Sequence, residues 1–262
     1  MDKKYTFQDL IDIMIKLRSD DGCPWDKVQT HQSIRKNFLE ETCEVLEAID
    51  NNDPELLKEE LGDVLLQVVF HAQMENEVGT FDINDVIHDV CQKLVIRHPH
   101  IFSDTVATTS AEVLNNWEKI KRQQKGFQNK TEYLKAVAKT LPALMRAEKV
   151  GSRGSKSGFD FECLEDTITS LEDELKELKL AIANADQKNI SEEFGDVLLS
   201  CVNVSRFLNL DSEECLNKAT DKFIDRFEKV EKLSSNADLT KLTQDELNAL
   251  WDKAKQDVHS VS

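Results

Sequence analysis

The sequence KEELGDVLLQVV (residues 58–69) has a close copy in SEEFGDVLLSCV (residues 191–202). Each copy places Glu-x-Gly-Asp inside an otherwise apolar run of helical character. Glycine weakens a helix by about 1 kcal/mol relative to alanine, and carboxylates are rarely buried without a partner. The same two departures from ordinary helix chemistry, made twice, indicate a repeated functional unit.

Other features recur around both copies in the same order. An E-x-x-E pair comes first, and 16 residues separate its last member from the next motif in each half (44 to 60, and 177 to 193). Downstream, KLVIR (93–97) and KFIDR (222–226) each give Lys-x-x-x-Arg, and one tryptophan follows in each half. Repetition of this kind predicts two homologous domains, which we place at 1–122 and 131–262, with the seam in the polar stretch KRQQKGFQNK (121–130).

Composition predicts an all-α fold, with each domain a helical bundle. Only 4 prolines and 8 glycines occur among 262 residues, and 40% of the chain is hydrophobic, enough to form cores. A net charge of −17 argues against nucleic acid as a partner, because phosphate backbones require a basic surface. The apolar runs are too short to cross a bilayer, so we expect no membrane association. Six cysteines without a CxxC pair, and no signal peptide, predict reduced thiols in a cytoplasmic protein.

The paired acids lie on the apolar stripes of their helices, which predicts that they face neighbouring helices. Residues three apart share one helix face, so each pair presents two carboxylates together. Carboxylates gathered in this way repel one another unless a multivalent cation neutralises them, and all-oxygen ligation favours Mg²⁺, with Mn²⁺ as a substitute. The glycines at 62 and 195 would allow close approach of a neighbouring helix or of a ligand. The predicted metal ligands are Glu174, Glu177, Glu193 and Asp196 in the second half, and Glu41, Glu44, Glu60 and Asp63 in the first.

The Lys-x-x-x-Arg pairs place two cations on one helix face, which suits the oxygens of a polyphosphate. They are Lys222 and Arg226 in the second half, and Lys93 and Arg97 in the first. The alternative is that these side chains pair with surface acids. For Trp117, Trp251 and Trp25, packing between helices competes with a role beside a ligand.

Two other motifs give weaker signals. In RHPHIF (97–102) the proline prevents a regular helix, so we interpret His98 and His100 as loop or packing residues rather than metal ligands. GSRGSKSG (151–158) lacks the ending of a phosphate-binding loop and follows no strand, so we interpret it as a flexible connector.

Taken together, EExxE (Glu40, Glu41, Glu44), ExxD (Glu60, Asp63), GCPWD (22–26) and IRHPHIF (96–102) resemble the MazG family over essentially the whole chain. The resemblance implies an all-α, tandem-domain nucleoside triphosphate pyrophosphohydrolase. It also implies Mg²⁺-dependent release of monophosphate and pyrophosphate, broad tolerance of the base, and a bundle completed in a homodimer.

Carried onto this sequence, the resemblance assigns the eight acids to metal and the two Lys-x-x-x-Arg pairs to phosphate. It places Trp251 near the nucleotide, and Glu192 becomes a candidate proton acceptor. The second half departs from the family pattern at Asp173, where a glutamate is expected. Because Pro99 should end the helix that carries Lys93 and Arg97, we expect the C-terminal domain to form the better site.

Three alternatives remain open at this point. A di-iron carboxylate oxidoreductase would normally supply Glu-x-x-His, whereas both motifs here end in carboxylates and no histidine is expected on their faces. A non-catalytic nucleotide-binding regulatory protein would keep the fold without turnover. A dUTP- or phosphoribosyl-ATP-specific pyrophosphohydrolase would carry the same motifs.

Overall fold

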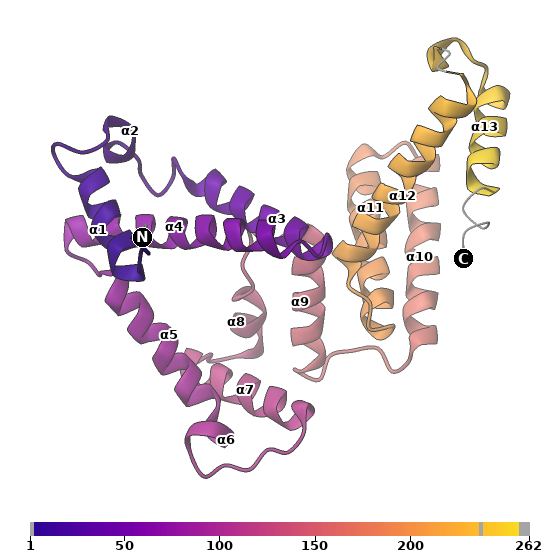
Figure 1. The fold of residues 1–262 in the computed structure, drawn as a ribbon. Helices are drawn as coiled ribbons and strands as arrows, with labels where there is room; N and C mark the ends of the chain where they lie inside the picture. Colours follow the sequence, from indigo (N-terminus) through magenta and orange to yellow (C-terminus); the bar gives the residue numbers. More distant parts are fainter. Residues whose placement is uncertain (1–2, 236–237, 257–262) are drawn as a thin grey trace. The chain divides into compact units, whose positions relative to one another are not determined.

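The structure is a computed structural model that describes residues 3–235 and 238–256. Within these ranges it contains helices and no strand, which confirms the all-α prediction (Figure 1). No helix among them is both long and apolar enough to cross a membrane. The chain divides into two compact units, residues 1–124 (unit 1) and 125–262 (unit 2).

Unit 1 is built on a pair of helices, α3 and α4, that pack side by side (Figure 1). Helix α1 packs on α4, and α5 follows α4 after a short turn. The helices of this unit are α1 (Phe7–Arg18), α2 (Pro24–Lys27), α3 (Arg35–Asp50), α4 (Pro54–Val78), α5 (Ile83–Arg97), α6 (Pro99–Phe102) and α7 (Ser110–Lys125, which ends at the unit boundary).

The sharp turn between α3 and α4 is specified locally by sequence. Asn52 adopts a left-handed conformation (φ 54°), which asparagine tolerates better than most residues. Asp53 then caps α4 by accepting hydrogen bonds from the N–H groups of Glu55 and Leu56, and Pro54 occupies the first turn, where its missing N–H costs nothing. This turn fixes how the acids of α3 meet those of α4.

The core of unit 1 lies on the side of α4 that faces α1. Met14, Val69 and Phe70 are almost completely buried there, together with Ile34 and Ile83. Burying each such side chain contributes about 1.5–3 kcal/mol. The second half of α4 is thereby fixed, while its first half carries the acids.

Unit 2 repeats the helix pair as α10 and α11. Its turn follows the same plan, with Ala185 in the left-handed region (φ 53°) and Asp186 capping α11 at Asn189. Helix α9 packs on α11, and α12 on α13 and α9. The helices are α8 (Lys130–Lys135), α9 (Ala143–Ser155), α10 (Leu164–Ala183), α11 (Gln187–Phe207), α12 (Ser212–Leu233) and α13 (Gln244–Gln256), with the 3₁₀ turn η1 (Leu239–Lys241) before α13.

The interpretation of residues 151–158 as a connector is wrong, because residues up to Ser155 continue α9. A Cβ atom at Gly151 would lie 3.3 Å from Nε of Arg206 on α11. The glycine therefore allows close packing of two helices rather than chain flexibility.

Part of the apolar stripe of each helix pair is not covered by other helices of its own unit. Ile49 and Leu61 in unit 1, and Ile182 and Phe194 in unit 2, are all exposed, although they belong to the stripes that should face inward. Periodicity locates an apolar face, but it does not say whether the same chain covers it.

Candidate metal and nucleotide site

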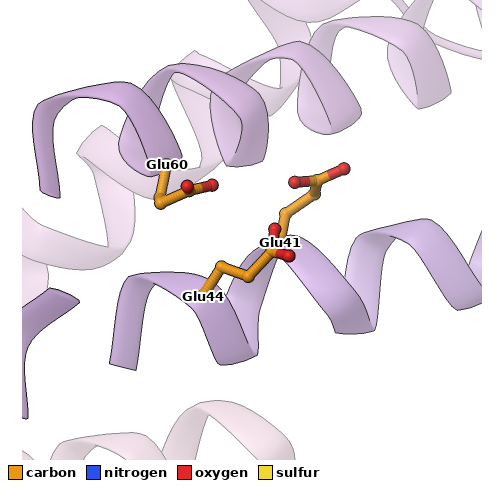
Figure 2. Close-up of side chains that lie close together, drawn as sticks. All are labelled: Glu41, Glu44 and Glu60. Atoms are coloured by element: carbon orange, nitrogen blue, oxygen red, sulfur yellow. The ribbon is translucent and has the colours of Figure 1, made fainter. Parts of the chain in front are cut away.

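In unit 1 the acids of α3 and α4 converge between the two helices. Glu41 and Glu44 lie one turn apart on α3, and Glu60 faces them from α4 (Figure 2). One carboxylate oxygen from each of the three lies within 4.8 Å of the other two. Asp63 lies outside this set, although its charge still raises the pKa of Glu41.

Unit 2 holds the same arrangement between α10 and α11. Glu174, Glu177 and Glu193 each offer an oxygen within 4.8 Å of the others, and Asp196 acts on Glu174 as Asp63 acts on Glu41. The glutamate that begins each ExxE or ExxD motif is half-buried: Glu41 and Glu60 in unit 1, and Glu174 and Glu193 in unit 2. Glu44 and Glu177 are exposed. The structure thus brings together three of the four acids predicted in each unit, and the aspartate of each unit lies outside the converging set.

The acids disturb one another's ionisation. Burial raises the pKa of Glu41 and of Glu174, and the neighbouring carboxylates raise both further. The pKa values of Glu60 and Glu193 are raised by the same two causes in the same order. Converging carboxylate oxygens with raised pKa values are the donor set that suits a hard divalent cation, whose charge would remove the repulsion.

Gly62 and Gly195 do not allow the close approach of a neighbouring helix that the sequence predicts. A Cβ atom at Gly62 or at Gly195 would meet nothing within 4 Å among the described residues. Close approach of a neighbouring helix of the same chain is therefore wrong as an explanation. Approach of a ligand or of another chain remains a prediction.

Arg97 is already engaged within unit 1. Helix α5 ends at Arg97, as Pro99 predicts. The Nε–H of Arg97 donates to Oε1 of Gln124 at 2.9 Å, and its guanidinium lies 5.3 Å from the ring centre of Trp117. Lys93 is exposed one turn earlier on α5. Among the described residues of unit 1, neither cation forms a hydrogen bond or an ion pair with Glu41, Glu44 or Glu60.

Arg226 has a different environment in unit 2. Helix α12 continues past it to Leu233, as expected. Its Nε is buried and has no hydrogen-bond partner in the described part of the chain, and Lys222 is exposed one turn earlier. Trp251 packs against Phe223 of α12, with ring centres 5.1 Å apart, so it anchors α13 to α12.

The remaining candidates lie at the surface or in packing contacts. Glu192 is exposed beside Glu193, and Asp173 pairs with Lys176 at 2.8 Å. Trp25 is exposed on α2. The Nδ1 atom of His98 is hydrogen-bonded to the carbonyl oxygen of Leu94 at 2.6 Å, in agreement with a packing role.

Comparison with known proteins decides the family. Residues 29–102 and 163–231, which contain both acid clusters, match the MazG nucleotide pyrophosphohydrolase domain. The chain belongs to the MazG family. It is 45% identical over 251 residues to the nucleoside triphosphate pyrophosphohydrolase/pyrophosphatase MazG of Thermotoga maritima, covering 95% of each chain. It is 40% identical over 252 residues to the nucleoside triphosphate pyrophosphohydrolase of Escherichia coli K12, covering 94% of this chain and 96% of that protein.

One polar cluster of this MazG chain is not predicted by its sequence pattern. His71 and Glu75 lie one turn apart on α4, and both make contact with His31, which precedes α3. His71 follows Glu60 by eleven residues, close to three helical turns, so it lies on nearly the same face. The expectation that no histidine lies on the acid-bearing faces is therefore wrong for α4. The His71–Glu75 spacing was a visible signal, but His31 is 40 residues away in sequence.

Proposed function

We propose that this MazG protein hydrolyses nucleoside triphosphates to the monophosphate and pyrophosphate with Mg²⁺ held by the acids of unit 2. The observation that carries the proposal is the convergence of Glu174, Glu177 and Glu193 within 4.8 Å of one another. The relatives from T. maritima and E. coli are named for hydrolysis of this class. Mn²⁺, with the same preference for oxygen ligands, should substitute.

The residues of unit 2 divide into two roles. Glu174, Glu177, Glu193 and Asp196 hold the metal, which supplies positive charge to the phosphate oxygens and makes water a better nucleophile. Arg226 and Lys222 bind phosphate oxygens from α12, and phosphate would give the buried Nε of Arg226 its missing partner. Trp251 lies near the nucleotide in this proposal, and Glu192 accepts the proton of the attacking water.

Unit 2 is the better hydrolytic site in this proposal. Its cation Arg226 retains an unpartnered donor among the described residues, whereas Arg97 in unit 1 is engaged with Gln124 and Trp117. In unit 1, Glu41, Glu44, Glu60 and Asp63, with Lys93 and Arg97, form a second nucleotide site of lower activity. Residues 1–122 and 131–262 are the corresponding homologous domains.

The surroundings of the site support three further parts of the proposal. Exposed apolar side chains such as Leu61 and Phe194 beside the acids fit a homodimer that covers them. All six cysteines are free, which fits a cytoplasmic protein. The side chains assigned in unit 2 are acids and cations for metal and phosphate, so we propose that it tolerates different bases and does not act on nucleic acid.

Product analysis tests the proposal. The purified protein is incubated with Mg²⁺ and one triphosphate at a time, and the products are separated by ion exchange, with Glu193→Ala alongside. Monophosphate and pyrophosphate in equal amounts are expected, and in Glu193→Ala their formation should fall to the lower activity of unit 1. Diphosphate and phosphate would refute the reaction, and unchanged turnover in Glu193→Ala would refute the assignment to unit 2. Metal binding without turnover of any nucleotide would favour a regulatory protein, and turnover of a single nucleotide would refute base tolerance.

A further inference from the structure

Unit 1 contains a cavity of about 420 Å³ that the proposed reaction does not use. Its apolar walls come from Phe38 of α3, Val68 of α4, Phe81 in the turn after α4, and Val86 of α5. Its polar lining consists of His31, His71 and Glu75. A mostly apolar cavity of this size with a few polar groups has the character of a small-molecule site.

The three polar residues form one hydrogen-bonded chain. The Nδ1 atoms of His31 and His71 lie 2.7 Å apart with the rings parallel to within 5°, and Nε2 of His31 lies 2.7 Å from Oε1 of Glu75. The hydroxyl of Thr80 also donates to Glu75 and, with the bond from His31, lowers the pKa of that carboxyl group. Burial and the neighbouring His31 lower the pKa of His71.

The hydrogen bonds among Glu75, His31 and His71 determine whether Nε2 of His71 can donate a hydrogen bond to a ligand or accept one. An ionised Glu75 accepts the Nε2–H of His31, so neutral His31 presents a lone pair at Nδ1. His71 then donates its Nδ1–H to His31 and keeps Nε2 as an acceptor. One added proton reverses the shared bond and makes Nε2 of His71 a donor. The ring thus provides a directed hydrogen-bonding group beside aromatic walls.

The cavity lies further along the same helix pair than the acid cluster. Phe38 is one helical turn from Glu41 on α3, and His71 follows Glu60 by eleven residues, about 16 Å of helix rise, on α4. Because His71 and Glu60 lie on nearly the same face of α4, one extended ligand can contact both. We propose that the cavity is a base-reading pocket, in which His71 hydrogen-bonds the heterocyclic edge of a nucleotide whose phosphates lie at the unit 1 acids. The phosphate part rests on the proposed function.

The positions of unit 2 that correspond to His71 and Glu75 carry aliphatic side chains. Glu60 and Glu193 are equivalent, so His71 and Glu75 correspond in register to Val204 and Leu208. Aliphatic side chains can pack against any base, but they cannot distinguish one hydrogen-bonding edge from another. Unit 1 should therefore select among bases, whereas unit 2 should not.

Free nucleosides test the pocket without involving the metal or the phosphates. Adenosine, guanosine, cytidine and uridine are titrated into the full chain with EDTA, and the ring resonances of His31 and His71 are followed by NMR. The expected result is a saturable shift with at least one nucleoside, unequal affinities among the four, and binding about tenfold weaker in His71→Val, which copies unit 2. The conservative His71→Gln should retain part of the affinity.

The result that would overturn the pocket is the absence of any saturable shift at 10 mM nucleoside (about the weakest affinity that a single such site should give), or equal binding by wild type and His71→Val. A matched Val204→Ala change in unit 2 should leave the nucleoside-induced shifts of the His31 and His71 resonances unchanged. Tripolyphosphate with Mg²⁺ tests the acid cluster separately. If the wild-type protein binds nucleoside but does not bind tripolyphosphate with Mg²⁺, the proposed phosphate site is refuted and the base-reading pocket is not.

Discussion

Replacing one acid of the cluster in unit 2 should have opposite effects on stability with and without metal. In Glu174→Gln the side chain keeps its size and loses its charge. Two unit charges 4.8 Å apart repel by about 1 kcal/mol in a water-like dielectric, and salt reduces this further. Without metal, the variant should therefore be more stable than wild type by up to about 1 kcal/mol, which is about 4 °C in the melting temperature of a unit of this size.

Adding Mg²⁺ should reverse the order. Metal at about 100 times its dissociation constant stabilises the folded wild type by about 2.7 kcal/mol. A tenfold loss of metal affinity in Glu174→Gln would remove about 1.4 kcal/mol of this. The two melting curves, recorded by differential scanning calorimetry in EDTA and then in Mg²⁺, should cross over.

The pH dependence has a definite sign. Because the pKa of Glu174 is raised on folding, the folded protein binds protons more readily than the unfolded chain. The stability of the metal-free wild type should therefore fall as the pH rises above the ordinary glutamate value of 4.5, and the advantage of Glu174→Gln in EDTA should disappear below it. Glu172→Gln, an exposed acid on the same helix, is the matched control and should change neither melting curve. Equal destabilisation of Glu174→Gln in both buffers would refute the reasoning.

Three further changes test separate parts of the account. Arg226→Met should raise the KM for nucleotide at least tenfold with little loss of melting temperature, because its buried Nε has no partner among the described residues; an unchanged KM would remove it from the site. Gly195→Ala should stabilise unit 2 by about 1 kcal/mol in calorimetry, since its Cβ meets nothing within 4 Å in the described chain; a lower melting temperature would show that another surface lies there. Asp160→Asn should cost about 1.5–3 kcal/mol by urea unfolding, because Asp160 receives two hydrogen bonds from Arg206. That pair holds the pKa of Asp160 below 3.8, so the difference from wild type should shrink as the pH falls below that value, and a constant difference would contradict the pairing.

The helix pairs and their acids could be predicted from sequence because both depend on local spacing. Glu41 and Glu44 must share a face once α3 forms, and the Asp53–Pro54 cap sets where α4 begins. The repeat then predicted that the same geometry would occur twice, as Glu174 and Glu193 confirm.

The rest depended on contacts that spacing cannot supply. His31 meets His71 across 40 residues, so no local pattern brings them together. Residues 151–158 are predicted to be a flexible connector because they lack the ending of a phosphate-binding loop and follow no strand, yet Gly151 lies in a helix that packs closely on Arg206. Leu61 follows the apolar period and is still exposed, because the period does not specify which surface covers it.

The most direct test of the central claim is the position of the metal. Crystals of the full chain grown with Mn²⁺ and a non-hydrolysable triphosphate analogue would show the ion in an anomalous difference map. We expect a peak coordinated by oxygens of Glu174, Glu177 and Glu193, with the phosphates of the analogue beside it and Arg226 in contact with them. A metal bound elsewhere, with these three carboxylates free of it, would contradict the account.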